Sequence, residues 1–175
     1  ESRQSLPKQF IPMFGHQTLL DHTLSRVKSI KHSSKPIIVS SKIHGFHVKK
    51  SLNALKMDAE LIFEPEGKNT TAAIYLAAKA SLKEENLIIM PSDHFIPDKN
   101  QFIKVIDEIN NINEFSNWIT LGVKPTRPIE SYGYIQTYNN VRKTLLNVKS
   151  FGRDNKEDMG FELILILLIN DYKNL

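Results

Sequence analysis

Short apolar runs alternate along the chain with longer stretches in which apolar residues recur at helical spacing. Thr18 can cap a helix in which Leu20, Leu24, Val27 and Ile30 fall one above another. The same criteria predict further helices over residues 46–55, from Asn69 or Thr70 to Ala80, and over 102–109, and strands over 37–39, 59–63, 87–90 and 118–121. We expect the strand at 37–39 to be buried. This alternation predicts an open, three-layer α/β sheet of mostly parallel strands joined by right-handed crossovers.

The pattern changes after residue 121. Residues 132–138 and 144–151 predict two more strands, which would form a hairpin around Asn139 and Asn140. The longest apolar run, Phe161 to Ile169, contains Glu162 and is far shorter than the roughly 20 residues that cross a bilayer, so we expect no membrane span. If exposed, this run would be an aggregation hazard.

Charge and composition narrow the classes of partner. The 175 residues carry a net charge of +4, and their lysines are scattered rather than gathered on one segment. Nucleic-acid binders usually concentrate positive charge, so we expect no nucleic acid partner, and an anionic small molecule suits the charge equally well. The chain has no cysteine and does not open on a secretory leader, which fits a cytoplasmic protein.

The segment around Pro91 carries the strongest chemical signal. An apolar strand, Leu87–Met90, ends at this proline and is followed at once by Ser92, Asp93 and His94. Ligands of α/β sheets bind beyond the carboxyl ends of the strands, and a carboxylate there can hold Mg²⁺ together with substrate phosphates. We do not expect a hydrolase triad, because adjacent residues of an extended chain point to different sides and no GxSxG elbow is present.

Three other segments each allow two interpretations. Lys8 follows Pro7 and is either a phosphate-binding ammonium or a solvated surface lysine. Residues 64–71 join a strand to a helix, so this turn is either an anion site at a helix N-terminus or an ordinary cap. Gly133, between two tyrosines, marks either close approach of a ligand or a simple bulge.

Familiar nucleotide and metal motifs are missing from the sequence. There is no GxxxxGK[ST] loop and no GxGxxG fingerprint. His44 and His47 are spaced three apart, but no third metal ligand is evident nearby, so we expect a structural role for both.

In this order and on this pattern, the segments resemble the bacterial mannose-1-phosphate guanylyltransferase family. The family stretches Ser-Arg-x-x-x-Pro-Lys-Gln-Phe, Glu-Pro-x-x-Arg-Asn-Thr, Pro-Ser-Asp-His and Gly-Tyr-Gly-Tyr-Ile are matched by Ser2–Phe10, Glu64–Thr70, Pro91–His94 and Ser131–Ile135. Lys68 replaces the arginine of the second stretch, and Ser131 replaces the first glycine of the last.

The resemblance implies an incomplete Rossmann-like fold of the nucleotidyltransferase type. It also implies transfer of GMP from GTP to mannose 1-phosphate, which gives GDP-mannose and pyrophosphate with Mg²⁺ as cofactor. Such an enzyme would serve polysaccharide biosynthesis and could be a homo-oligomer. The resemblance assigns metal binding and catalysis to Asp93, phosphate neutralisation to Lys8, nucleotide contacts to Asn69, Thr70 and Ser92, and the sugar side to Gly133 and Tyr134.

The resemblance ends close to residue 151. The family begins with a glycine-rich loop that would precede Glu1, and it continues after Phe151 with Glu-Lys-Pro where this chain has Gly152-Arg153-Asp154. We therefore expect residues 1–151 to form a partial nucleotidyltransferase domain and residues 152–175 to be a divergent tail, for which a frameshift is one explanation. The alternative function is a non-catalytic remnant that at most binds nucleotide or a partner chain.

Overall fold

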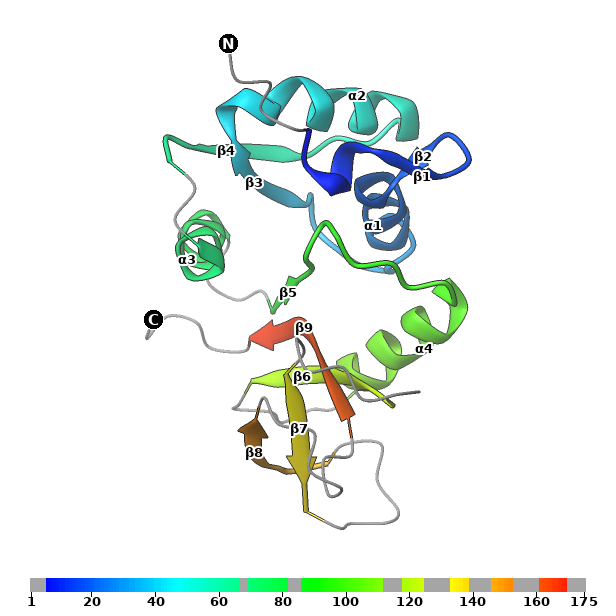
Figure 1. The fold of residues 1–175 in the computed structure, drawn as a ribbon, viewed down its shortest axis with the longest axis vertical. Coiled ribbons are helices and arrows are strands. Elements are labelled where there is room, and N and C mark those ends of the chain that lie inside the picture. Colours follow the sequence, from blue (N-terminus) through cyan, green and yellow to red (C-terminus); the bar gives the residue numbers. More distant parts are fainter. Residues whose placement is uncertain are drawn as a thin grey trace.

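The structure is a computed structural model that describes residues 6–66, 69–81, 86–111, 118–124, 133–138, 146–152 and 161–169. Figure 1 shows the amino-terminal elements, in blue and cyan, in the upper part of the view and the five-stranded sheet in the lower part. The elements are η1 (Lys8–Phe10), β1 (Pro12–Phe14), β2 (Gln17–Thr18), α1 (Leu19–Val27), β3 (Ile37–Ser41), η2 (Lys42–His44), α2 (Gly45–Leu55), β4 (Glu60–Glu64), α3 (Asn69–Ala80), β5 (Leu87–Ile89), α4 (Lys99–Asn110), β6 (Ile119–Val123), β7 (Tyr134–Thr137), β8 (Val148–Gly152) and β9 (Phe161–Ile169).

Helix α1 begins with the cap that the sequence predicts. The Asp21 N–H donates to Thr18 Oγ1 at 3.1 Å, and the Thr18 N–H donates to Asp21 Oδ2 at 2.8 Å. The two side chains thus satisfy two backbone donors reciprocally at the start of the helix, which is a capping box.

The capping box leads to a stability prediction. Replacing Thr18 by alanine removes one acceptor and leaves the N–H of Asp21 without its partner. We expect Thr18→Ala to lower the free energy of unfolding by about 1 kcal/mol, as measured by urea titration. Thr71→Ala, at an exposed position of α3, is the matched control and should change the free energy by less than about 0.5 kcal/mol. Equal effects of the two substitutions would contradict the role of the cap.

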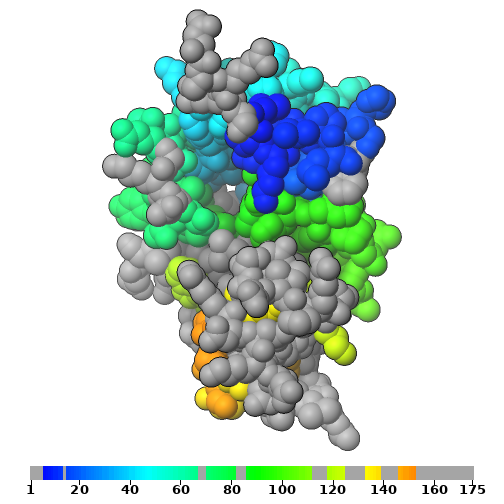
Figure 2. Space-filling model, viewed as in Figure 1, coloured from blue at the N-terminus to red at the C-terminus, as the bar shows by residue number. Residues whose placement is uncertain are grey.

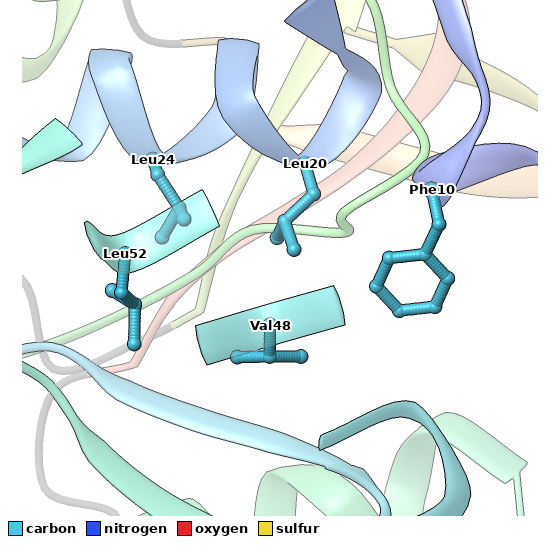
Figure 3. Packing of buried hydrophobic residues seen from close by; sticks show 5 residues of the cluster. All are labelled: Phe10, Leu20, Leu24, Val48 and Leu52. Atoms are coloured by element: carbon cyan, nitrogen blue, oxygen red, sulfur yellow. The ribbon is translucent and has the colours of Figure 1, made fainter. Parts of the chain in front are cut away.

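The first core cluster joins α1 to α2. Leu20 and Leu24 of α1 point towards Val48 and Leu52 of α2, and Phe10 closes one end of the cluster (Figure 3). All five side chains are buried, and partly buried residues of β3 and β4 pack against them. Because Phe10 belongs to η1, this cluster also fixes the position of the neighbouring Lys8 backbone.

Strands β3 and β4 form a two-stranded parallel sheet, as the alternation of strands and helices predicts. Their register runs from Ile37 opposite Glu60 to Ser41 opposite Glu64. The expected burial of β3 is wrong, however, because all five of its residues are only half-buried. The reason is a large groove that borders this strand, as described below.

The five-stranded sheet has β9 at its centre. Strand β9 pairs antiparallel with β5, β6 and β7, and β7 in turn pairs antiparallel with β8. Strands β5 and β6 therefore run in the same direction but are separated by β9, whereas the sequence predicts that neighbouring strands are mostly parallel. The α/β class is confirmed. The apolar run at 161–169 forms this central strand.

Helix α4 packs on the sheet through the second core cluster. Asp98 caps the helix by accepting a hydrogen bond from the Gln101 N–H at 2.8 Å. Ile106 is completely buried at the centre of the cluster. The other buried members of the cluster are Ile30, Phe102 and Ile109.

Within the described part of the chain, no helix is both long and apolar enough to cross a bilayer.

Some boundaries differ from those expected. Helix α3 begins at Asn69, so both candidate caps lie inside the helix rather than before it. The antiparallel pairing of β7 with β8 confirms the predicted hairpin, but its turn at Asn139 and Asn140 lies outside the described residues. The hairpin of β1 and β2 was not predicted. It turns at Gly15, whose φ of +65° favours glycine.

Candidate functional site

The candidate site is built around the turn that follows β5. This strand ends at Ile89, and Pro91 leads into a turn at Ser92 and Asp93, all half-buried. The carboxylate side chain of Asp93 keeps 34% of its surface exposed, so it lies at the protein boundary rather than in the core. The turn therefore presents a carboxylate to solvent at the carboxyl end of a strand.

Lys8 reaches Asp93 from the opposite end of the sequence. Lys8 Nζ lies 2.9 Å from Asp93 Oδ2, which is a salt bridge. The backbone of Lys8 is held in η1, and the next turn of this segment is anchored by the buried Phe10. Packing of η1 onto α1 thus brings together the two charged residues that the sequence singles out separately.

The pKa of Asp93 reflects two opposing influences. Partial burial acts to raise it, but the hydrogen bond and positive charge of Lys8, with a smaller contribution from His94, outweigh burial and hold the pKa below its ordinary value. His94 Nε2 lies 3.9 Å from Asp93 Oδ1. Asp93 is consequently ionised at neutral pH.

The lowered pKa of Asp93 predicts how the stability of the protein depends on pH. Because the folded-state pKa of Asp93 is depressed, its contribution to stability is present above about pH 4 and is lost as pH falls through the lower folded value. Lys8→Met should raise the pKa of Asp93, measured by NMR titration of its carboxyl carbon. The associated loss of stability at pH 7 should stay below about 1 kcal/mol, because solvent screens this pair.

The Lys35–Asp58 salt bridge provides a matched control. Its Nζ and Oδ2 atoms are 2.7 Å apart, and Lys35 likewise lowers the pKa of Asp58. Lys35→Met should therefore move the titration of Asp58 and leave that of Asp93 unchanged. If Lys8→Met left the Asp93 titration unchanged as well, the salt bridge would not be what depresses that pKa.

A buried arginine supports the turn from behind, and sequence reasoning alone missed it. Arg26 of α1 is 2% exposed, and its Nη2 donates to Thr23 Oγ1 at 2.8 Å and to the His94 carbonyl oxygen at 3.1 Å. Its guanidinium carbon lies 5.9 Å from the centre of the Phe102 ring, and burial lowers its pKa. In the sequence, Arg26 could be recognised only as an arginine close to the apolar face of α1. Such an arginine is typical of an ordinary surface position, so it did not indicate burial.

A pocket of about 1340 Å³ collects three of the expected site residues. Thr70, Ser92 and Asp93 line it, together with Gln9 and His94. Thr70 is exposed in the first turn of α3, where free backbone N–H groups favour an anion. Asn69 begins the same turn, but its side chain is outside the described part, as is Lys68.

Residues 2–152 match the nucleotidyl transferase family. This range includes η1, the turn after β5 and the β7–β8 hairpin, and it covers most of the chain. The chain belongs to the nucleotidyl transferase family.

Curated relatives of this nucleotidyl transferase chain are considerably longer. A mannose-1-phosphate guanylyltransferase of Salmonella montevideo is 36% identical over 137 residues, which are 77% of this chain and 29% of that protein. The alginate biosynthesis protein AlgA of Pseudomonas putida is 33% identical over 140 residues, 78% of this chain and 29% of that protein. The chain thus spans less than a third of the length of these relatives.

Solved structures show the same fold. A mannose-6-phosphate isomerase from Helicobacter pylori has a TM-score of 0.79 and 26% identity, covering 93% of this chain and 66% of that one. A protein described as a mannose-1-phosphate geranyltransferase from Thermus thermophilus has a TM-score of 0.80 and 23% identity, covering 97% of this chain and 52% of that one. The described elements therefore make up part of a larger nucleotidyltransferase fold.

The two residues expected on the sugar side do not join the pocket. The side chain of Tyr134 is completely buried in β7, and Gly133 is half-buried just before that strand. Neither residue lines the pocket that contains Asp93. Any sugar contact from these two residues would have to come from their backbone. Ser131 and Tyr132 of the same motif lie outside the described residues.

The histidines of η2 and α2 pack against Phe10. The ring centres of His44 and His47 lie 5.1 Å and 5.3 Å from that of Phe10. Both rings thereby extend the first core cluster, in line with the structural role expected for them. Among the described residues, no group of three or more histidine or acidic side chains could hold a metal.

Proposed function

We propose that this chain provides the nucleotide side of a mannose-1-phosphate guanylyltransferase, which transfers GMP from GTP to mannose 1-phosphate. The observation that carries the proposal is the 2.9 Å contact of Lys8 with Asp93 at the carboxyl end of β5. A cation and an anion beside a large pocket can bind the phosphates of a nucleotide and a divalent cation, respectively.

Asp93 is the proposed ligand for Mg²⁺. Its carboxylate is ionised and partly exposed, and Mg²⁺ needs only one or two carboxylates when substrate phosphates and waters complete its shell. A single carboxylate of this kind fits a metal ion that arrives together with the nucleotide better than a metal ion held by protein side chains alone. In the described ranges, no group of three metal-binding side chains occurs. When bound, Mg²⁺ would supply charge neutralisation of the phosphates.

The remaining roles follow from position. Lys8 would act as a point charge on a phosphate oxygen, and the hydroxyls of Thr70 and Ser92 would donate hydrogen bonds to the nucleotide. Asn69 would contribute from the same helix turn as Thr70. Gly133 and Tyr134 would meet the sugar through their backbone, since the tyrosine side chain is buried.

The proposed reaction is an in-line displacement at phosphorus. A phosphate oxygen of mannose 1-phosphate forms a bond to the α-phosphorus of GTP, and the bond from that phosphorus to the pyrophosphate oxygen breaks. GDP-mannose and pyrophosphate are the products. Catalysis of this kind depends on positioning and on stabilisation of developing charge, so the fixed Lys8 and Asp93 matter more than any general base. We propose the cytoplasm as its location.

We expect this chain by itself to have little or no turnover. Gly133 and Tyr134, the two described residues expected on the sugar side, do not line the pocket with Asp93, so among the described residues the groups proposed to hold the two substrates do not meet in one pocket. The loss of one hydrogen-bond donor that stabilises the transition state can cost about 3 kcal/mol. The loss of two such donors would reduce the rate more than about ten-thousandfold. This favours the second candidate, a binding remnant, for the chain in isolation.

A pyrophosphate-release assay tests the proposal. Purified chain with GTP, mannose 1-phosphate and Mg²⁺ should release pyrophosphate only at trace level. Any turnover that appears should be abolished by Asp93→Asn and unaffected by Glu108→Gln, which changes an exposed carboxylate that does not line the pocket. Robust turnover would refute the binding-remnant assignment, and activity retained in Asp93→Asn would refute the assignment of the metal to that residue.

A further inference from the structure

We infer that Arg26 is a positioning residue of the candidate site, which holds the turn after β5 so that the Asp93 carboxylate stays beside Lys8. Arg26 acts from behind this turn, through the His94 backbone, and does not itself contact a substrate. Its effect on nucleotide binding rests on the proposed function, whereas its effect on the turn is a property of the chain alone.

The hydrogen bond from Arg26 joins two segments that are far apart in the sequence but adjacent in the fold (Figure 1). Its Nη2 atom donates to the His94 carbonyl oxygen at 3.1 Å. This carbonyl belongs to the residue directly after Asp93, so fixing it restricts the exit from the turn. The entry is restricted by Pro91 and by the pairing of β5 with β9. Both ends of the turn that carries Asp93 are therefore held.

Thr23 fixes the direction in which the guanidinium of Arg26 points. The same Nη2 atom donates to Thr23 Oγ1 at 2.8 Å, and both residues belong to α1. The guanidinium carbon also lies 5.9 Å from the centre of the Phe102 ring of α4. Because a guanidinium is planar, two directed hydrogen bonds and a ring contact leave it little rotational freedom. Arg26 can thus transmit the rigidity of α1 to the turn.

Helix α1 supports both charged partners of the site. Its apolar face packs against Phe10, which lies in η1 together with Lys8 (Figure 3). Through Arg26, the same helix holds the turn that carries Asp93. In Figure 2 the blue atoms of the amino-terminal segment lie against the green atoms of the segment after β5, in agreement with the 2.9 Å contact between Lys8 and Asp93. One helix therefore sets the position of each partner relative to the other.

The burial of Arg26 has a cost that packing alone does not require. The residue is 2% exposed, and burial lowers its pKa because the charge is removed from water. Among the described residues, its Nε and Nη1 atoms have no hydrogen-bond partner. A buried cation with unpaired donors weakens a fold, and an apolar side chain of similar length would avoid this penalty. The hydrogen bond to the turn is what an apolar side chain could not provide.

Backbone mobility of the ¹⁵N-labelled chain, without nucleotide, tests the inference directly. NMR relaxation gives each amide an order parameter, which is about 0.85 in rigid backbone and below about 0.6 in flexible backbone. Methionine fills similar space to arginine but donates no hydrogen bond. We expect Asp93 and His94 to be rigid in the unsubstituted chain and flexible in Arg26→Met, while α1 and α4 stay rigid in both.

Lys28→Met is the matched control for this measurement. Lys28 directly follows α1 and donates to another distant backbone carbonyl, that of Leu55, at 2.8 Å. Its substitution removes the same kind of hydrogen bond at a residue that does not line the pocket, so the order of Asp93 and His94 should not change. The inference is overturned if the turn stays rigid in Arg26→Met, if both variants loosen it equally, or if α1 and α4 loosen as much as the turn.

Arg26→Lys decides the question if Arg26→Met does not fold. Lysine keeps the positive charge but lacks the planar fork, so it cannot hold the Thr23 hydroxyl and the His94 carbonyl in the same geometry. We expect order parameters between about 0.6 and 0.85 at Asp93 and His94 in this variant. Values equal to those of the unsubstituted chain would overturn the inference.

The consequence for the site is measured separately, by calorimetric titration with GTP and Mg²⁺. Arg26→Met should weaken binding at least about fivefold, although Arg26 does not line the pocket. The same substitution should have no further effect in a chain that already carries Asp93→Asn, because Arg26 acts through Asp93. Equal weakening in both backgrounds would overturn the inference. If the unsubstituted chain binds no GTP, the proposed function fails, and the order parameters alone decide the role of Arg26.

Discussion

Removal of residues 153–175 should destroy the five-stranded sheet, because it deletes the strand that β5, β6 and β7 share. Strand β9 pairs with each of these three, and β5 has no other strand beside it in the described ranges. Short strands without a common partner are marginally stable in water. We expect amide exchange at Ile119–Val123 and Leu87–Ile89 to accelerate about a thousandfold, which corresponds to about 4 kcal/mol.

A shorter truncation controls this experiment. Removal of residues 170–175 leaves the whole of β9 in place and should change exchange in β5 and β6 by less than about threefold, or roughly 0.6 kcal/mol. Unchanged protection of β6 after the longer truncation would show that residues 161–169 are not its partner. Residues 152–175 would then be a separate tail, as the sequence suggests.

Ile106→Ala should have the largest effect of any single substitution in the described core. Ile106 is completely buried in α4 and lies at the centre of the cluster that contains Ile30, Phe102 and Ile109. Its truncation loses apolar burial and leaves a cavity that the surrounding helix and sheet can close only partly. We expect the free energy of unfolding to fall by about 3–4 kcal/mol in urea titration.

An exposed isoleucine provides the matched comparison. Ile43 is 65% exposed in η2, so Ile43→Ala removes the same atoms from a position that buries few of them. Its effect should stay within about 0.5 kcal/mol. If the two substitutions cost the same, α4 is not packed as described.

The local elements were largely predictable from the sequence, because their signals are local. Thr18 as the cap of α1 depends on contacts within three residues, and the structure confirms it. The apolar periodicity of α4 and the apolar runs of β3, β4 and β5 were also sufficient to identify these elements. Boundaries were less certain, as the start of α3 at Asn69 shows.

The arrangement of the strands was not predictable in the same way. The run Phe161–Ile169 could be recognised as apolar, but nothing local indicates that it lies between β5 and β6. Strand pairing depends on partners far apart in the sequence, and a continuous apolar run does not specify which ones. The half-burial of β3 was missed for a related reason, because burial depends on what lies beside an edge.

In the candidate site, too, the individual residues could be predicted from local sequence, but the contacts between them could not. Asp93 could be singled out because a carboxylate follows an apolar strand, and Lys8 because it follows a proline in a matching motif. Their 2.9 Å contact required the packing of η1 onto α1, which no local pattern specifies. Arg26 could not be recognised, because its importance comes from burial and from the distant His94 carbonyl.

Binding of GTP with Mg²⁺ tests the central claim that Lys8 and Asp93 form a nucleotide site. Calorimetric titration of the chain should show weak binding that requires Mg²⁺ and that Asp93→Asn weakens at least about tenfold, or about 1.4 kcal/mol. Glu108→Gln should leave the affinity unchanged, since it alters an exposed carboxylate of α4 that does not line the pocket. Equal affinity of the two variants, or binding that does not depend on Mg²⁺, would contradict the account.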